Sequence, residues 1–414
     1  MTAEIAIINR FGIALAADSA VTIGDERVWK TTNKLFSLGP NHDIGIMIYG
    51  GGTYLGCPWD TVIKEFREAT KNTDFRFVHE VIPSFFEFLR QPRWGTDEDD
   101  LLSIVRLIVK ELDEYAGSFD DLNDDGAKLK RLTQLIDLEQ KKISSSDISF
   151  EFDINEFETA FFDYVDHLVD KLFDFDVPNE VKSLMLAYMY AYASRAENVS
   201  NHETGIVFCG FGRDEIYPVL IEAFMDGRFK GIVRWWKARS YDFNAERGQL
   251  GTVVPFAQRD MTNIFMEGIS HTFVQFFHTV IESVLRKKTD RLISKLEPDQ
   301  DKRKDLLKRE RKVDSKFLEA IFDTFLNLRH RESIQPLMSA IRSLPREEMS
   351  AMAEALVELT SLRRKIDSRV QSVAGPVDVA FISKGDGFVW MKRKYYFDGS
   401  LNQDYEIRRK KKLG

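Results

Sequence analysis

Thr2 is the first residue whose type and position could do chemistry. It follows Met1 and is small enough for Met1 to be cleaved from it, so we expect the mature chain to begin at Thr2. Such a threonine carries both a hydroxyl and a free α-amine, which titrates near ~7.7–8.0 and can accept the hydroxyl proton as a general base. A threonine after Met1 is common and by itself indicates nothing, so its neighbours must decide.

Two charged residues follow at positions that could serve this nucleophile. Asp18 ends the apolar stretch GIALAADS, and Lys34 lies in the next strand-like segment, RVWKTTNKLFSLG. If two strands return both side chains to the start of the chain, Lys34 favours ionisation of the Thr2 hydroxyl, and Asp18 orients and neutralises Lys34. This is the geometry of a proton relay.

The segment GIMIYGGGT supplies a glycine turn after an apolar strand. Glycine lets a backbone approach a substrate closely, and the N–H of Gly50 could stabilise a tetrahedral oxyanion. The alternative is a simple turn from strand to helix. A phosphate-binding loop is not indicated, because the Lys-Ser/Thr that follows such glycines is missing.

The elements that must position these residues follow the order strands, helices, strands, helices, strands. Apolar β-branched runs predict strands up to residue 56, over 204–240 and again near the end of the chain, and helical spacing dominates between them. Asp226-Gly227 predicts a tight hairpin turn, and the acidic run at 97–100 predicts a loop. This order predicts an α+β protein, a four-layer α-β-β-α sandwich of two antiparallel sheets.

The start of the chain resembles the proteasome β-subunits and the bacterial ATP-dependent threonine peptidase. The likeness rests on MT, GIALAADSAVT, the lysine at 34 and GIMIYGGG. It implies an N-terminal-nucleophile (Ntn) hydrolase sandwich and no cofactor. The large helical insertions that we expect in this sandwich depart from the family pattern. The catalytic residues it implies are Thr2, Asp18, Lys34 and Gly50.

The resemblance also implies residues that support the nucleophile. In the family an Asp and a Ser precede the last hairpin, here GPVDVAFISKGDGFVW, but Val370 and Val373 occupy those positions. Asp367 and Ser372 are near enough to substitute for them. Ser19 and Gly51 complete the supporting set, and no metal ligand is expected.

We expect five regions along the chain. They are the N-terminal half of the sandwich with the active site (1–92), a mainly helical insertion (93–200), strands of the second sheet (201–260), a helical region with an insertion (261–370), and C-terminal strands with a basic tail (371–414).

The partners follow from the resemblance and from what the sequence lacks. The resemblance implies a peptide or protein substrate and a homo-oligomer. Since no P-loop is present, energy-driven unfolding of a substrate would need a separate ATPase or regulatory partner. Two other functions stay open: a non-catalytic proteasome-like scaffold that binds a partner, and a hydrolase of non-peptide amides.

Composition excludes several classes of protein. The formal net charge of −8 gives no overall electrostatic footprint for nucleic acid. The two cysteines have no metal-ligand spacing and are too few for a disulfide scaffold, which is typical of a reducing compartment. With no apolar window long enough to span a membrane and no leader-like start, we expect a cytoplasmic protein.

Overall fold

The computed structural model describes residues 3–23, 27–29, 32–116, 119, 122, 124–144, 148–195, 204–245, 251–367, 375–395, 397, 401, 402 and 407. The chain divides into two compact units. Unit 1 comprises residues 1–32, 246–381 and 389–412, and unit 2 comprises residues 33–245, 382–388 and 413–414.

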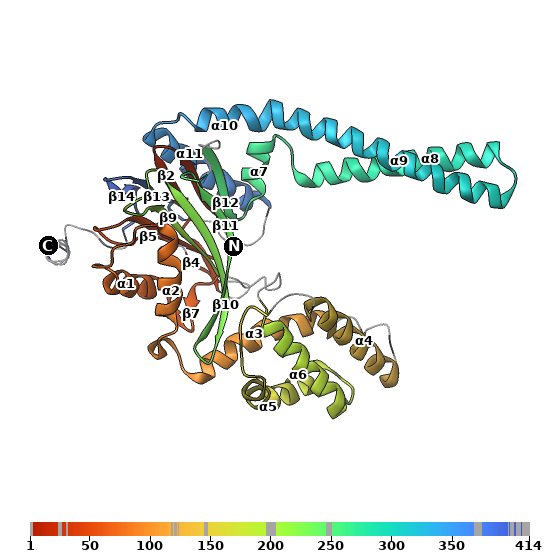
Figure 1. Cartoon of the computed structure of the whole chain (residues 1–414), viewed down its shortest axis with the longest axis horizontal. Coiled ribbons are helices and arrows are strands. Elements are labelled where there is room, and N and C mark those ends of the chain that lie inside the picture. The colour runs from red at the N-terminus through yellow and green to blue at the C-terminus, as the bar shows by residue number, and fades with distance from the viewer. Residues whose placement is uncertain are drawn as a thin grey trace. The chain divides into compact units, whose positions relative to one another are not determined.

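Unit 1 is built on a five-stranded sheet with the order β12-β1-β2-β13-β14 (Figure 1). Its strand β1 pairs antiparallel with β2 on one side and with β12 on the other. Every residue of β1 and β2 is buried, which explains their nearly continuous apolar sequences. The strands are β1 (Ala3–Asn9), β2 (Gly12–Ala17), β12 (Gly251–Ala257), β13 (Asp378–Ser383) and β14 (Gly387–Lys392).

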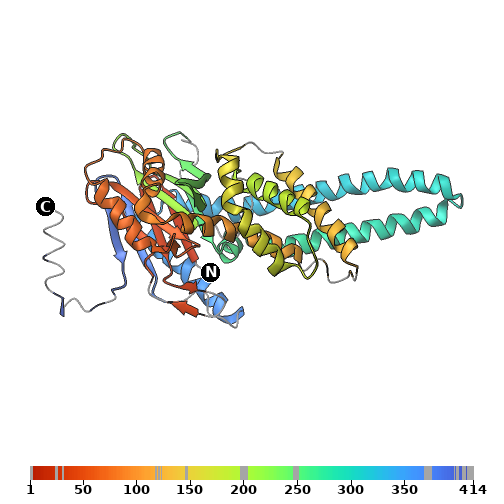
Figure 2. The ribbon, with the colours of Figure 1, turned by 90° about the horizontal axis from the view of Figure 1, so that it is seen from below.

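Helices pack against this sheet to form the core of unit 1. Apolar residues of α10 and α11 share one cluster with residues of β1, β2 and β13. The elements are a short ribbon of β3 (Val21–Ile23) and β4 (Arg27–Trp29), the helices α7 (Asp260–Glu267), α8 (His271–Leu296), α9 (Gln300–Arg329), α10 (Gln335–Ile341) and α11 (Arg346–Asp367), and the π-helical turn η4 (His330–Ile334). Helices α8 and α9 lie side by side as a long hairpin in both views (Figures 1 and 2).

Unit 2 contains a second five-stranded sheet, with the order β11-β10-β9-β6-β5. All four of its strand pairs are antiparallel. The strands are β5 (Leu35–Ser37), β6 (Asp43–Tyr49), β9 (Thr204–Phe211), β10 (Val219–Phe229) and β11 (Ile232–Asp242), and a two-stranded ribbon joins β7 (Thr53–Tyr54) to β8 (Cys57–Pro58). Apolar residues of α1 (Trp59–Ala69) and α2 (Val81–Leu89) pack on this sheet, and α2 follows the 3-10 turn η1 (Val78–Glu80).

Four further helices of unit 2 have a core of their own. They are α3 (Asp97–Ala116), α4 (Asp125–Ser144), α5 (Ile154–Leu172) and α6 (Asn179–Ala193), and they follow the 3-10 turn η2 (Pro92–Trp94). Their aromatic residues pack on Phe229 at the end of β10: the ring centroids of Phe157 and Phe161 lie 5.4 and 5.5 Å from it. The Phe-rich stretches of this region therefore serve helix packing.

Two local expectations are wrong. Asp226-Gly227 does not form a hairpin turn, because β10 continues through both residues with a bulge, and the turn lies at Lys230 and Gly231, which both have positive φ. The acidic run at 97–100 is not a loop but the first turn of α3. Acidic side chains at that position interact favourably with the helix dipole.

The chain is thus a mixed α and β protein with antiparallel sheets, which agrees with the expected class. Among the helices within the described residues, none combines the length and apolar character that crossing a lipid bilayer requires.

Candidate functional site

Asp18 directly follows β2 and is hydrogen-bonded to Ala3, the first residue of β1. Its side chain is 1% exposed, and its Oδ1 accepts the N–H of Ala3 at 3.1 Å. The Asp18 N–H donates in turn to the Ala3 carbonyl at 3.1 Å, and Oδ2 accepts the N–H of Ala20 at 3.4 Å. The carboxylate therefore holds the main chain of the residue that follows Thr2. Thr2 itself lies outside the described residues.

Three of the expected supporting residues belong to unit 1, and the structure describes the surroundings of one of them. Ser19 is fully buried, and its hydroxyl donates to the Pro376 carbonyl at 2.5 Å, which ties the end of β2 to the segment before β13. Asp367 is the last residue of α11, and its side chain lies outside the described part of the chain. Ser372 also lies outside it. Of these three, the structure describes a contact for Ser19.

Lys34 and Gly50 come together in unit 2. Lys34 directly precedes β5, and its carbonyl accepts the N–H of Ile48 at 3.0 Å. Gly50 directly follows β6, so the pairing of β5 with β6 brings both residues to the same end of these strands. The Lys34 side chain is 4% exposed, which is unusual for a lysine.

The glycines after β6 are required by geometry. Gly50 has a φ of 86°, a conformation that other residues rarely adopt. A Cβ atom at Gly51 would lie 2.6 Å from the Oγ1 atom of Thr204. The structure therefore explains why glycine stands at these two positions, and a role of the turn in binding an oxyanion stays a prediction.

A buried polar network that sequence reasoning missed holds Tyr49, the residue before Gly50. The Tyr49 hydroxyl donates to Oε1 of Glu222, which is fully buried. Arg239 donates to both oxygens of Glu222, with its Nη2 lying 3.1 Å from Oε1. Glu222 and Arg239 face each other across β10 and β11. A lone glutamate inside an apolar strand was the one available signal in the sequence.

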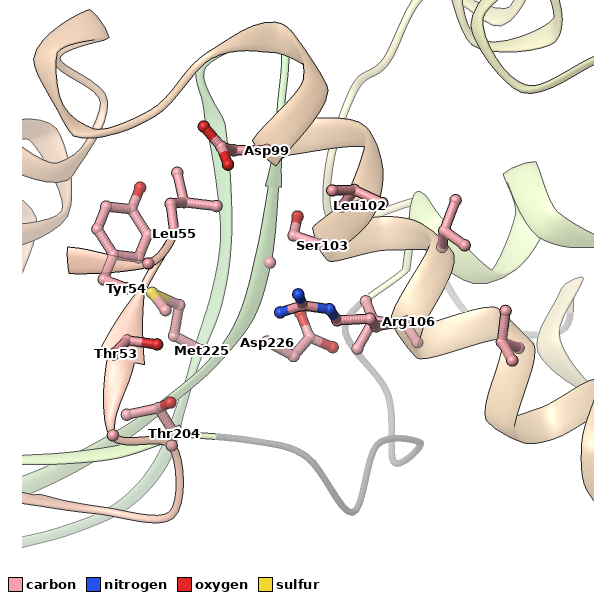
Figure 3. A pocket seen from close by; sticks show the side chains of 17 residues that line it. Thr53, Tyr54, Leu55, Asp99, Leu102, Ser103, Arg106, Thr204, Met225 and Asp226 are labelled. Carbon is pink, nitrogen blue, oxygen red and sulfur yellow. The ribbon is translucent and has the colours of Figure 1, made fainter. Parts of the chain in front are cut away.

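A cavity of about 710 Å³ opens beside the glycine turn, between it and α3 (Figure 3). Apolar side chains and Arg106 reach into it, and Figure 3 shows Arg106 and Asp226 directed toward each other. Its lining includes Gly51, Gly52, Thr53, Leu55, Asp99, Leu102, Ser103, Arg106, Thr204, Met225 and Asp226. The cavity can admit a side chain or a chain end next to the turn.

The two acidic residues of the cavity are engaged within unit 2. Asp99 accepts the N–H and the hydroxyl of Thr96, both at 2.8 Å, and these hydrogen bonds hold its pKa below the usual range. Asp226 is bound by Arg234 through two hydrogen bonds, at 2.8 and 2.9 Å. Arg106 is the one Lys or Arg among the lining residues, and it faces Asp226.

Within the described ranges, no three His, Cys, Asp or Glu side chains lie close enough together to hold a metal ion.

Comparisons with known proteins give a distant likeness. No protein-family model matches the chain, and no curated protein does. Among solved structures, the Anbu (Gly-1) mutant from Hyphomicrobium sp. strain MC1 is similar at 9% identity and a TM-score of 0.31, covering 100% of this chain and 97% of that chain. Anbu (ancestral beta-subunit) from Yersinia bercovieri is similar at 8% identity and a TM-score of 0.29, covering 98% of this chain and 94% of that chain.

A third similar structure is the helical assembly of the Anbu complex from Pseudomonas aeruginosa, at 9% identity and a TM-score of 0.27, covering 99% of this chain and 95% of that chain. These findings correct the resemblance drawn from the sequence. The expected likeness to bacterial proteasome-type threonine peptidases is wrong: no family model matches, and the similar structures are Anbu proteins that share 8–9% of their residues with this chain.

Proposed function

We propose that this protein is an amide hydrolase whose nucleophile is Thr2, with peptides as its substrate class. The observation that carries the proposal is the hydrogen bond from the Ala3 N–H to the buried carboxylate of Asp18. An N-terminal nucleophile acts only if the chain start is held in place. Asp18 holds the main chain one residue away from Thr2, in a position that a solvated chain end would not need.

The reaction uses the two functional groups of one residue. After removal of Met1, the Thr2 hydroxyl attacks the carbonyl carbon of the amide, and its proton passes to the Thr2 α-amine. The tetrahedral oxyanion accepts the N–H of Gly50. The amine leaves with the proton, an ester to the Thr2 oxygen remains, and water hydrolyses that ester to free the enzyme.

Lys34 completes the proposed site. Its ammonium group favours the ionised form of the Thr2 hydroxyl, and Asp18 balances its charge. The burial of Lys34 and its place at the same end of the strands as Gly50 support this role. The proposal includes the four-layer α-β-β-α sandwich that the sequence predicts.

Mass spectrometry tests the nucleophile first. We expect the purified protein to begin at Thr2 and an electrophile that traps N-terminal threonine to label that residue. The variant Thr2→Ala should lose Met1 as well but stay unlabelled. A chain that retains Met1, or label that is equal in both proteins, would refute the proposal.

Hydrolysis of a panel of fluorogenic peptides and small amides tests the role of Lys34 beside the nucleophile. Lys34→Met should lower kcat by about 10²-fold or more, the range expected when proton transfer is impaired. Lys71→Met is the matched control, because Lys71 is a lysine of the same unit with 54% of its side chain exposed. Equal loss in both variants would show that Lys34 has no catalytic part.

A further inference from the structure

The hairpin of α8 and α9 has very little core of its own. Both helices are described throughout, and in these 56 residues the buried ones among the apolar side chains are Ile293 and Leu318, each 7% exposed. Amphipathic helices in proteins are stabilised mainly by packing an apolar face. A two-helix hairpin of this length therefore lacks a partner for part of its apolar surface.

The largest continuous part of that exposed apolar surface on α8 is a stripe near its N-terminal end, which we call the α8 stripe; Val313 and Phe317 of α9 are exposed as well. The members of the stripe are three, one, three and four residues apart, which places them within about 100° of one another around the helix axis, and each is between 40% and 61% exposed. They are Phe273, Phe276, Phe277, Val280 and Val284.

The α8 stripe is not the face that α8 turns toward α9. The two helices meet through His278, whose ring centroid lies 4.7 Å from that of Phe322, and through Thr289, whose hydroxyl donates to Asp314 at 2.6 Å. At 100° per residue, His278 points about 160° away from Phe276 and from Val280. The helix thus has a second apolar face beside the one that holds the hairpin together.

The area of the stripe suits an interface between proteins. At about 200 Å² for an aromatic side chain and somewhat less for valine, the exposed parts of the five side chains amount to roughly 500 Å². Two such stripes in contact would bury about 1,000 Å² from these residues alone, which reaches the lower limit for a specific interface before the flanking side chains are counted.

The charges on and beside the α8 stripe favour a second copy of this chain as its partner over a membrane surface. Between His271 and Leu285 the one formally charged side chain is Glu282, whereas residues 286–312, around the end of the hairpin, carry twelve Lys and Arg against six Asp and Glu. A twofold interface brings a surface against its own copy, so a nearly uncharged stripe meets no like-charge repulsion. A helix that binds an anionic membrane surface would instead carry Lys and Arg beside its apolar face.

We propose that the α8 stripe is the surface through which two copies of this chain pair, with their α8 helices antiparallel across a twofold axis near Phe277 and Val280. The inference does not depend on chemistry at Thr2. It replaces a general expectation of a homo-oligomer with a named surface.

Sedimentation velocity of the full chain tests the proposal. We expect wild-type protein to be dimeric at micromolar concentration and F276E/V280E to dissociate, with its dissociation constant raised more than tenfold. The matched control is Leu296→Glu, an even more exposed apolar residue (79%) of the same hairpin outside the stripe. Circular dichroism melting checks that all three proteins are folded.

Cross-linking tests the orientation. In a Cys57→Ser background, Val280→Cys should form covalent dimers with a short bis-maleimide, and Leu296→Cys should not. A wild-type protein that is monomeric up to about 100 μM would overturn the proposal. So would an oligomer that F276E/V280E leaves intact, or a wild-type monomer whose binding to anionic phosphatidylglycerol vesicles is lost in that variant.

Discussion

Arg234→Met should destabilise unit 2 more than any surface substitution, because Arg234 joins the sheet to the helical core. The guanidinium and its partner Asp226 are each 2% exposed. Arg234 also donates to the carbonyls of Tyr192 and Arg195, both at 3.2 Å, and to that of Ala193. It therefore closes the C-terminal end of α6, where helix carbonyls lack partners within the helix.

The magnitude follows from what the substitution leaves behind. An uncompensated buried carboxylate costs about 3–5 kcal/mol, and the lost hydrogen bonds to main-chain carbonyls add about 1 kcal/mol or more. We expect a loss of about 4–6 kcal/mol, a large part of the stability of a typical domain. For a unit of this size the melting temperature should fall by roughly 10 °C or more.

Urea unfolding measured by tryptophan fluorescence is the assay, because most tryptophans of the chain lie in unit 2, namely Trp59, Trp94, Trp235 and Trp236. Arg90→Met is the control, since Arg90 and its partner Glu87 are 55% and 72% exposed, and its effect should stay below about 0.5 kcal/mol. In R234M/D226L much of the loss should be recovered, because the buried charge is gone. If R234M lies within about 1 kcal/mol of wild type, or the double variant recovers nothing, the reasoning fails.

Three further predictions concern single sites in unit 2. Burial raises the pKa of Glu215, so its contribution to stability is fully present below the unfolded pKa and is lost as pH rises through the folded value. Relative to Glu215→Gln, wild type should lose stability as pH rises above about 4, in denaturant titrations at each pH. Parallel curves for the two proteins would contradict this. Gly205→Ala should lower the free energy of unfolding by about 1–3 kcal/mol, since the new Cβ would lie 2.0 Å from the Tyr49 ring. Thermal melting measures this loss, and an unchanged midpoint would show that the ring moves freely. Cys209 is fully buried, which raises its pKa, whereas Cys57 is partly exposed. One thiol should therefore react with Ellman's reagent in native protein and two in urea. Two fast thiols in native protein would contradict the burial of Cys209.

The alternation and runs of apolar residues were enough to locate many of the strands, but not β12, which follows β11 in the chain and pairs with β1. The stretch from Thr204 to Cys209 lies in β9, and the glycines around Asp386 turn β13 into β14. These features depend on the side chains of neighbouring residues and on the backbone freedom of glycine, which a sequence displays directly. The same holds for the turn at Gly50.

Long-range pairs decided what local patterns could not. The acids at 97–100 begin a helix, and one of them, Asp100, is buried against Arg228, with its Oδ1 2.5 Å from Nε. Asp226 stays within β10 because Arg234 neutralises it there. From the sequence alone, each of these acids is typical of a loop or a turn. The arginine that pairs with it in the folded chain allows it to be buried in a helix or a strand instead.

The site divides in the same way. The sequence by itself determined a candidate nucleophile, the apolar strand that ends at Asp18, and a glycine turn, because each is a property of one short segment. Only the tertiary structure decided that Asp18 accepts a hydrogen bond from Ala3 and that Lys34 and Gly50 lie at the same end of β5 and β6. The same holds for the hydrogen bonds that join Tyr49 and Arg239 to Glu222. Buried polar groups must find partners, and the folded chain chooses those partners from segments that lie far apart in the sequence.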